Sequence, residues 1–160
     1  MLRLTDGRAA SQLGADVAVF DLPLSPAAGM PLAWAPSSRA SAAWVAQASH
    51  WLLALGFSPQ RIADAPGLVV ARTLAMLINE ALDAVQQGVC TPEGADAAMK
   101  LGVNYPAGPF EWLARWDAGA VIRLLDALDG FYRGERYRVS PALRQRAWQQ
   151  APWQAVKAAA

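Results

Sequence analysis

The amino-acid sequence predicts an α+β protein, in which a mixed segment of strands and helices (residues 1–64) precedes an all-helical segment (residues 65–160). The first observation is that short apolar runs separated by turn residues come before Asp64. The second is that apolar patterns with helical spacing follow Pro66. The third is composition, because 54% of the residues are hydrophobic and many are alanine, which favours closely packed helices. A chain of 160 residues fits one domain, or one domain and part of a second.

The first segment contains several short strand candidates. Leu2–Leu4, Val17–Phe20 and Leu32–Ala35 are apolar runs with turn residues or prolines beside them. Phe57–Ile62 is also expected to be extended. A brief helix is expected at Ala9–Leu13, so strands and helices alternate along this part of the chain.

One longer helix is expected inside the first segment. Ser37 or Ser38 can cap it, because a side-chain oxygen accepts a hydrogen bond from the free N–H groups of a first helical turn. The helix should run to about Leu55 and end at Gly56, since glycine is favoured at helix C-termini. Strand, helix and strand in this order form the pattern of an α/β layer.

The all-helical segment is expected to begin at Pro66, since proline suits a first helical turn. Apolar residues recur on one face of this helix, which ends at Gly88, and Asn79 is expected to lie away from that face. The next helix should be capped by Thr91. Later helices are expected at Phe110–Trp116, Ala118–Leu128 and Pro141–Gln150.

Charge and cysteine content exclude several classes of protein. The formal charge is +1, from 14 basic and 13 acidic side chains, and this balance gives no reason to expect a nucleic-acid or membrane partner. Cys90 is the only cysteine, so no internal disulfide can form, which suits a cytoplasmic location. His50 is the only histidine, and one histidine with one cysteine makes no zinc or iron site.

Four spaced motifs carry the most information. Asp64-Ala-Pro-Gly-Leu-Val-Val-Ala-Arg72 indicates a connector into a helix, and Asn79-Glu-Ala81 follows within that helix. Leu101-Gly-Val-Asn-Tyr-Pro-Ala-Gly-Pro109 comes about one helix pair later, and Arg136-Tyr-Arg-Val-Ser-Pro-Ala-Leu-Arg144 lies near the end. In this order and spacing the motifs resemble the C-terminal helical domain of the NAD-dependent 3-hydroxyacyl-CoA dehydrogenases.

The resemblance implies that residues 1–64 are a degenerate, partial Rossmann-like segment, corresponding to the back half of the family's nucleotide-binding domain. The whole chain is most similar to the degenerate second unit found at the C-terminus of tandem bacterial members, such as the 3-hydroxyadipyl-CoA dehydrogenases of phenylacetate breakdown. In such proteins the second helical domain would pack on the first as an internal substitute for a dimer partner.

The residues that the family uses for chemistry are replaced in this chain. The glycine-rich Gly-x-Gly-x-x-Gly turn is absent, so NAD is expected in the full-length enzyme and not in this chain. Asp21 is the titratable group nearest to the position of the catalytic histidine, and Trp34 lies where its glutamate partner is expected. Thr5 could imitate the substrate-binding serine, and Ala71 replaces an asparagine. We therefore predict no catalytic, cofactor-binding or metal-binding residue.

The motif residues are instead predicted to serve the structure or an interface. Arg72 is expected to be structural, and the pair Asn79 and Glu80 is expected to satisfy a neighbouring helix end or connector. Trp112 and Trp116, one helical turn apart, should pack in the core or line a subunit contact. The complete set of candidates is Pro66, Gly67, Arg72, Asn79, Glu80, Asn104, Tyr105, Pro106, Gly108, Pro109, Trp112 and Trp116.

Three functions are compatible with these observations. In the first, the chain is the assembly or dimerisation region of a 3-hydroxyacyl-CoA dehydrogenase, with a second copy or the catalytic portion as its partner. In the second, it is an autonomous enzyme fragment that binds acyl-CoA and recruits Thr5, Asp21 or Glu80. In the third, it is a stand-alone regulatory binding module.

Overall fold

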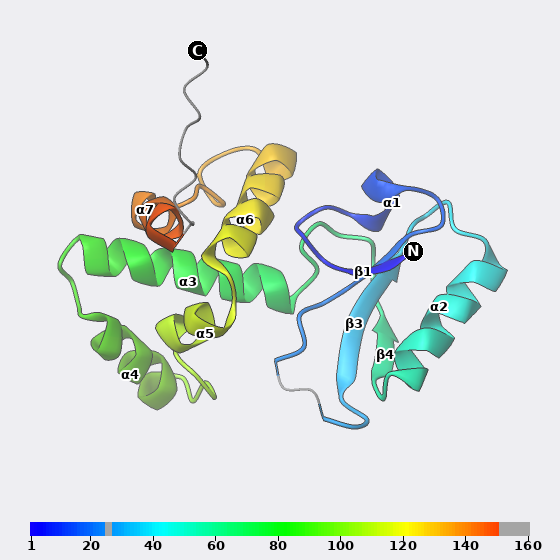
Figure 1. Ribbon diagram of the computed structural model, residues 1–160, viewed down its shortest axis with the longest axis horizontal. Coiled ribbons are helices and arrows are strands. Elements are labelled where there is room, and N and C mark those ends of the chain that lie inside the picture. The colour runs from blue at the N-terminus through cyan, green and yellow to red at the C-terminus, as the bar shows by residue number, and fades with distance from the viewer. Residues whose placement is uncertain (25–26, 151–160) are drawn as a thin grey trace, which may run out of the picture.

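A computed structural model describes residues 1–24 and 27–150. A sheet with two helices stands beside a body made only of helices (Figure 1). The predicted α+β class, with a partial Rossmann-like sheet ahead of a helical domain, is confirmed. The first part comprises β1 (Leu2–Leu4), α1 (Ala10–Leu13), β2 (Ala18–Phe20), β3 (Pro31–Pro36), α2 (Ala42–Ala54) and β4 (Ser58–Arg61). The second part comprises α3 (Val70–Gln86), α4 (Pro92–Gly102), α5 (Pro109–Arg115), α6 (Ala118–Tyr132) and α7 (Pro141–Gln150).

The strands lie in sequence order, β1-β2-β3-β4. The outer pairs β1–β2 and β3–β4 are parallel, and the central pair β2–β3 is antiparallel. Each parallel pair needs a crossover, which α1 and α2 supply. Phe20 lies opposite Trp34 in the central pair, so the chain leaves β2 next to the middle of β3.

Different elements cover the two faces of the sheet, because successive side chains of a strand point to opposite faces. On one face, Trp34 shares a buried cluster with Leu52 of α2. On the other face, Val19 clusters with Ala10 of α1 and with Leu68, which lies in the connector to the helical domain. The connector is thereby part of the packing of the sheet.

The start of α2 differs from the prediction. The cap is Ser41, whose Oγ accepts a hydrogen bond from the N–H of Trp44 (3.2 Å). The predicted cap Ser37 still belongs to the end of the sheet, because its N–H donates to the carbonyl of Val17 (2.9 Å). The other predicted cap, Ser38, lies in the turn between the two elements.

The start of α3 also differs, since the helix begins at Val70 and not at Pro66. Pro66 to Val69 form a turn. Gly67 (φ +74°) and Leu68 (φ +48°) have left-handed backbone conformations that a right-handed helix cannot contain. The turn reverses the chain so that Leu68 reaches the sheet before the helix starts.

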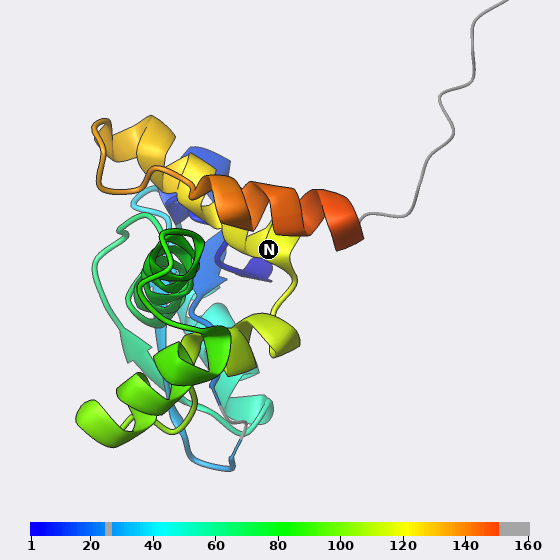
Figure 2. The same cartoon turned by 90° about the vertical axis from the view of Figure 1, so that its left-hand side faces the viewer.

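The long helix α3 is the centre of the helical body. It lies between α4 and α5 on one side and α6 and α7 on the other (Figures 1 and 2). Asn79 was expected to lie away from the apolar face, and this prediction is wrong, because its side chain is only 1% exposed. The core around α3 is formed by buried residues of four helices, including Leu74, Ile78, Leu113, Val121, Leu125 and Leu143.

A close contact joins α4 to the start of α5. Asp96 of α4 accepts a hydrogen bond from the N–H of Phe110 (2.8 Å). A β-carbon added to Gly108 would overlap both the backbone and the carboxylate of Asp96, so only glycine fits at this position. Glu111 closes the turn by accepting from the N–H of Gly108 (3.1 Å) and by pairing with Lys100.

Replacing Gly108 by alanine should destabilise the protein. The added methyl group meets the backbone of Asp96, which cannot move without shifting α4, so we expect a loss of about 3 kcal/mol in the free energy of unfolding. Urea denaturation followed by circular dichroism measures the change.

The matched control is Gly130→Ala in α6. A β-carbon at Gly130 meets nothing within 4 Å, so this variant should be more stable by about 0.5–1 kcal/mol. Equal effects of the two substitutions would contradict the proposed contact between α4 and α5.

Candidate functional site

The four positions that the resemblance assigns to chemistry are all buried. Thr5, Asp21, Trp34 and Ala71 are at most 5% exposed. The N–H of Thr5 donates to the carbonyl of Phe20 (2.9 Å), so Thr5 continues the sheet beyond β1. Its hydroxyl accepts a long hydrogen bond from the N–H of Gly7 (3.4 Å). These side chains serve the interior of the protein.

Asp21 caps the first turn of α3. Its Oδ2 accepts hydrogen bonds from the N–H groups of Val69 (2.9 Å) and Val70 (2.7 Å), and its Oδ1 accepts from that of Ala71 (2.8 Å). The residue at the helix start, Val69, has no side-chain acceptor of its own, so these N–H groups depend on Asp21. The negative charge also lies at the positive end of the helix dipole.

The structure therefore brings two of the replaced positions together. Asp21, at the position expected for the catalytic histidine, is hydrogen-bonded to the backbone of Ala71, at the position expected for the asparagine. Both carboxylate oxygens are occupied by backbone donors, and the side chain is 1% exposed. A general base must lie within hydrogen-bond distance of the substrate hydroxyl, and a buried carboxylate with both oxygens engaged cannot do so.

A second carboxylate joins α1 to the connector. Asp64 accepts hydrogen bonds from the N–H groups of Ala10 (2.6 Å) and Ser11 (2.8 Å) at the start of α1. In the same way, Ser41 accepts a hydrogen bond at the start of α2, and Asp21 accepts hydrogen bonds at the start of α3. Backbone N–H groups at the starts of all three helices are therefore already bonded to side-chain oxygens of the protein. These helix starts therefore do not fit the pyrophosphate of a dinucleotide, which needs free N–H groups at a helix N-terminus.

Arg72 and Asn79 fix the two ends of the helical body to α3. Arg72 donates to the carbonyl of Pro66 and to the hydroxyl of Tyr132 (3.1 Å), and its guanidinium lies 5.2 Å from the centre of that ring. Asn79 donates to the carbonyl of Arg138 (3.0 Å) and accepts from the N–H of Ser140 (2.7 Å), just before α7. Arg72 thus joins α3 to the side chain at the end of α6, and Asn79 joins α3 to the backbone ahead of α7.

The remaining candidates differ in their exposure. Glu80 is exposed, and its carboxylate accepts a hydrogen bond from the side-chain amide of the buried Asn79 (3.4 Å). Asn104 has a left-handed conformation (φ +57°) in the turn after α4. Tyr105 is 37% exposed, and its ring meets Trp112 edge to face with 5.6 Å between the ring centres. Pro106 lies in the same turn, Pro109 is the first residue of α5, and Trp116 is half-buried.

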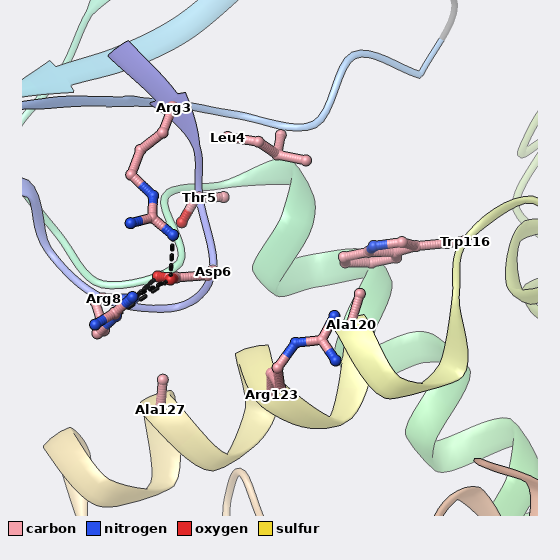
Figure 3. A pocket seen from close by; sticks show the side chains of 9 residues that line it. All are labelled: Arg3, Leu4, Thr5, Asp6, Arg8, Trp116, Ala120, Arg123 and Ala127. Carbon is pink, nitrogen blue, oxygen red and sulfur yellow. Dashed lines mark hydrogen bonds and ion pairs between the residues drawn. The ribbon is translucent and has the colours of Figure 1, made fainter. Parts of the chain in front are cut away.

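A cleft of about 530 Å³ lies between the loop after β1 and helix α6 (Figure 3). Arg3, Asp6 and Arg8 form one wall, and Trp116 and Arg123 lie on the opposite wall. Asp6 pairs with Arg3 (2.9 Å) and with Arg8 (2.5 Å). Thr5, the candidate for the substrate-binding serine, also lines this cleft, but the cleft itself was not predicted, because Arg123 lies far from Arg3 and Arg8 in the chain and none of the three belongs to a motif.

Arg3 and Arg8 favour the ionised form of the Asp6 carboxyl group. Its partial burial would by itself raise the pKa of the carboxyl group. Hydrogen bonds from the side chain and backbone of Arg8, with the positive charges of Arg8 and Arg3, outweigh burial and hold the pKa below its ordinary value of 3.8. Asp6 therefore remains a carboxylate that holds both guanidinium groups in place.

An apolar surface, which we call the α3–α4 surface, is formed by Val69, Leu77, Leu101, Val103 and Tyr105. Helix α4 is amphipathic, yet it contributes no buried residue. At its end, Leu101 is 87% and Val103 is 56% exposed. Tyr105 follows in the chain and lines an apolar groove of about 220 Å³ with Val69 and Leu77 of the α3 side. Isolated exposed apolar residues are common, but exposed apolar residues followed within a few positions by the wall of an apolar groove indicate a candidate contact surface.

Two family models match the chain. The model for the "3-hydroxybutyryl-CoA dehydrogenase reduced Rossmann-fold domain" matches residues 2–66, and the model for the "3-hydroxyacyl-CoA dehydrogenase, C-terminal domain" matches residues 67–155. The chain belongs to the 3-hydroxyacyl-CoA dehydrogenase family. The resemblance inferred from the spaced motifs is thus confirmed.

Individual relatives agree with this assignment. The 3-hydroxyadipyl-CoA dehydrogenase of Escherichia coli K12 is 48% identical over 101 residues, which are 63% of this chain and 21% of that enzyme. A probable 3-hydroxybutyryl-CoA dehydrogenase of Deinococcus radiodurans is 36% identical over 91 residues, which are 57% of this chain and 33% of that protein. A crystal structure of 3-hydroxybutyryl-CoA dehydrogenase from E. coli K12 superposes with a TM-score of 0.85 at 39% identity, over 92% of this chain and 31% of that one. The chain spans a third or less of these relatives.

Residues 1–24 and 27–150 contain no helix that is long and apolar enough to cross a bilayer. They also contain no group of three or more His, Cys, Asp and Glu side chains that could hold a metal ion.

Replacing Asp21 by alanine should destabilise the protein strongly. The substitution leaves three N–H groups of α3 without an acceptor in the interior, and we expect a loss of roughly 2–4 kcal/mol in the free energy of unfolding. Asp21→Asn, of the same shape, should also destabilise, because its amide NH₂ would face N–H donors. Chemical denaturation of both variants measures the effect; exposed Asp16 is the control, where alanine should cost less than about 0.5 kcal/mol.

The ion pairs of Asp6 should make stability depend on pH. The folded-state pKa lies below the ordinary value of 3.8, so as the pH falls the unfolded chain binds this proton first. The contribution of Asp6 is therefore present above about pH 3.8 and is lost as the pH falls through the lower, folded-state value. The difference in unfolding free energy between wild type and Asp6→Asn should shrink below about pH 3.8. Urea denaturation over a pH series measures it, and a difference that does not change with pH would contradict the ion pairs.

Proposed function

We propose that this chain is a non-catalytic assembly unit of an NAD-dependent 3-hydroxyacyl-CoA dehydrogenase. The complete enzyme would oxidise 3-hydroxyacyl-CoA to 3-oxoacyl-CoA, with NAD bound in its catalytic portion. This unit would dock through its helical domain onto the catalytic portion or onto a second copy of itself. The observation that carries the proposal is the α3–α4 surface, because Leu101 and Val103 at the end of α4 are 87% and 56% exposed although α4 itself packs on α3 and α5.

The lengths of the relatives support a second unit. The match covers 21% of the 3-hydroxyadipyl-CoA dehydrogenase but 33% of the shorter 3-hydroxybutyryl-CoA dehydrogenase, although the number of aligned residues is similar (101 and 91). The first enzyme is therefore much longer and has room for more than one unit. We accordingly propose that the chain acts in the cytoplasm, within an enzyme of phenylacetate breakdown.

The buried capping role of Asp21 supports the absence of catalysis in this unit. If the chain instead worked as an autonomous enzyme fragment, as in the second hypothesis, a base and a nucleotide site would have to form from residues that are already engaged. Turnover of a 3-hydroxyacyl-CoA with NAD by the purified chain, in an NADH-linked assay, would overturn the proposal.

The direct test of assembly is the oligomeric state. Light scattering of the purified chain should show a dimer, and Leu101→Lys should weaken dimerisation at least about tenfold, because it places a charge against an apolar partner surface. Leu53→Lys is the matched control, since Leu53 is also an exposed leucine (54%) but lies on α2. It should leave the dimer unchanged.

The catalytic portion is the other partner to be tested. If the wild-type chain is a monomer, calorimetry with a separately produced catalytic portion should show binding that Leu101→Lys weakens and Leu53→Lys does not. A strict monomer at high concentration, with no affinity for the catalytic portion, would contradict the proposal.

A further inference from the structure

The cleft between the loop after β1 and α6 has a positive charge that the proposed assembly role does not use. None of the residues lining the cleft belongs to the α3–α4 surface. Arg3, Arg8 and Arg123 line it together with a single carboxylate, that of Asp6, so the net charge of the lining residues is positive. Concave sites lined by one sign of charge concentrate ligands of the opposite sign.

The arginines retain hydrogen-bond donors that Asp6 does not use. A guanidinium group has five N–H donors in a planar fork. Arg3 gives one hydrogen bond to Asp6 (2.9 Å). Arg123 has only an ion pair with the exposed Asp117 at 3.6 Å, and within the described residues its side chain makes no hydrogen bond. One carboxylate cannot satisfy three guanidinium groups, so donors remain for a ligand.

The two walls of the cleft are held at a fixed separation. Gly7 lies between Asp6 and Arg8 with a left-handed backbone (φ +96°), and a β-carbon there would overlap Ala127 of α6 and lie 2.5 Å from the carbonyl oxygen of Leu124. The loop that presents Asp6 and Arg8 is therefore packed directly on the helix that presents Arg123. A site with fixed walls loses less conformational entropy when it binds a ligand.

We infer that this cleft binds a small organic molecule through a phosphate or carboxylate group. Arginine pairs with both groups through parallel N–H···O hydrogen bonds, and these are stronger than hydrogen bonds between neutral groups. The indole of Trp116 lines the cleft beside Arg123 and gives a flat apolar surface next to the positive charge (Figure 3). The volume of about 530 Å³ lies within the range of sites for small ligands, roughly 300–1,000 Å³.

The experiment is isothermal titration calorimetry of the full chain with three probes. Inorganic phosphate tests phosphate recognition, succinate tests carboxylate recognition, and phenyl phosphate adds a flat ring that can contact Trp116. Binding of phosphate without succinate identifies the phosphate group as the ligand feature, and the reverse result identifies the carboxylate group. Phenyl phosphate should bind more tightly than inorganic phosphate.

Variants locate the site. Arg123→Gln should weaken binding about tenfold or more, because it removes a charge-assisted hydrogen bond without disturbing the pairs of Asp6. Arg146→Gln, at an exposed arginine of α7 outside the cleft, should leave the affinity unchanged, and thermal melting should show that both variants are folded. No heat of binding with any probe, or equal binding by wild type and Arg123→Gln, would overturn the inference.

Discussion

The structure depends on one buried interaction, the carboxylate of Asp21 at the first turn of α3. Asp21 directly follows strand β2, and α3 is the helix around which the helical domain packs. The helix start has no acceptor of its own, and its N–H groups would be unsatisfied in the interior without this carboxylate. The same few atoms therefore complete the helix and attach the helical domain to the sheet.

This interaction fits the proposed non-catalytic role, because it uses the carboxylate of Asp21 to hold the family fold together. The resemblance places a catalytic histidine near Asp21 and an asparagine at Ala71, and here the two positions are joined by a hydrogen bond of 2.8 Å. Asp64 acts in the same way at α1. The side chains of Asp21 and Asp64 thus hold the sheet, the connector and α3 together, which is consistent with the proposed role in assembly.

The sequence predicted those features whose causes are local. Thr91 and Pro92 start α4 as expected, because the Oγ of Thr91 accepts from the N–H of Gly94 three residues away. The start of α3 was missed because its cap lies some 50 residues earlier in the chain. Asn79 was placed on the polar side of α3 because the pattern of a single helix cannot show a partner such as Ser140, 61 residues away. The arginine cleft was missed for the same reason, since only the folded chain brings its walls together.

Hydrogen exchange of the amides of Val70 and Ala71, measured by NMR, tests this account most directly. If Asp21 makes the sheet and the helical domain one cooperative unit, these amides at the first turn of a helix should exchange as slowly as those of the core residues Leu124 and Leu125, through global unfolding only. Rapid exchange of Val70 and Ala71 while the amides of α6 remain protected would show that the helix start opens by itself, and it would contradict the account.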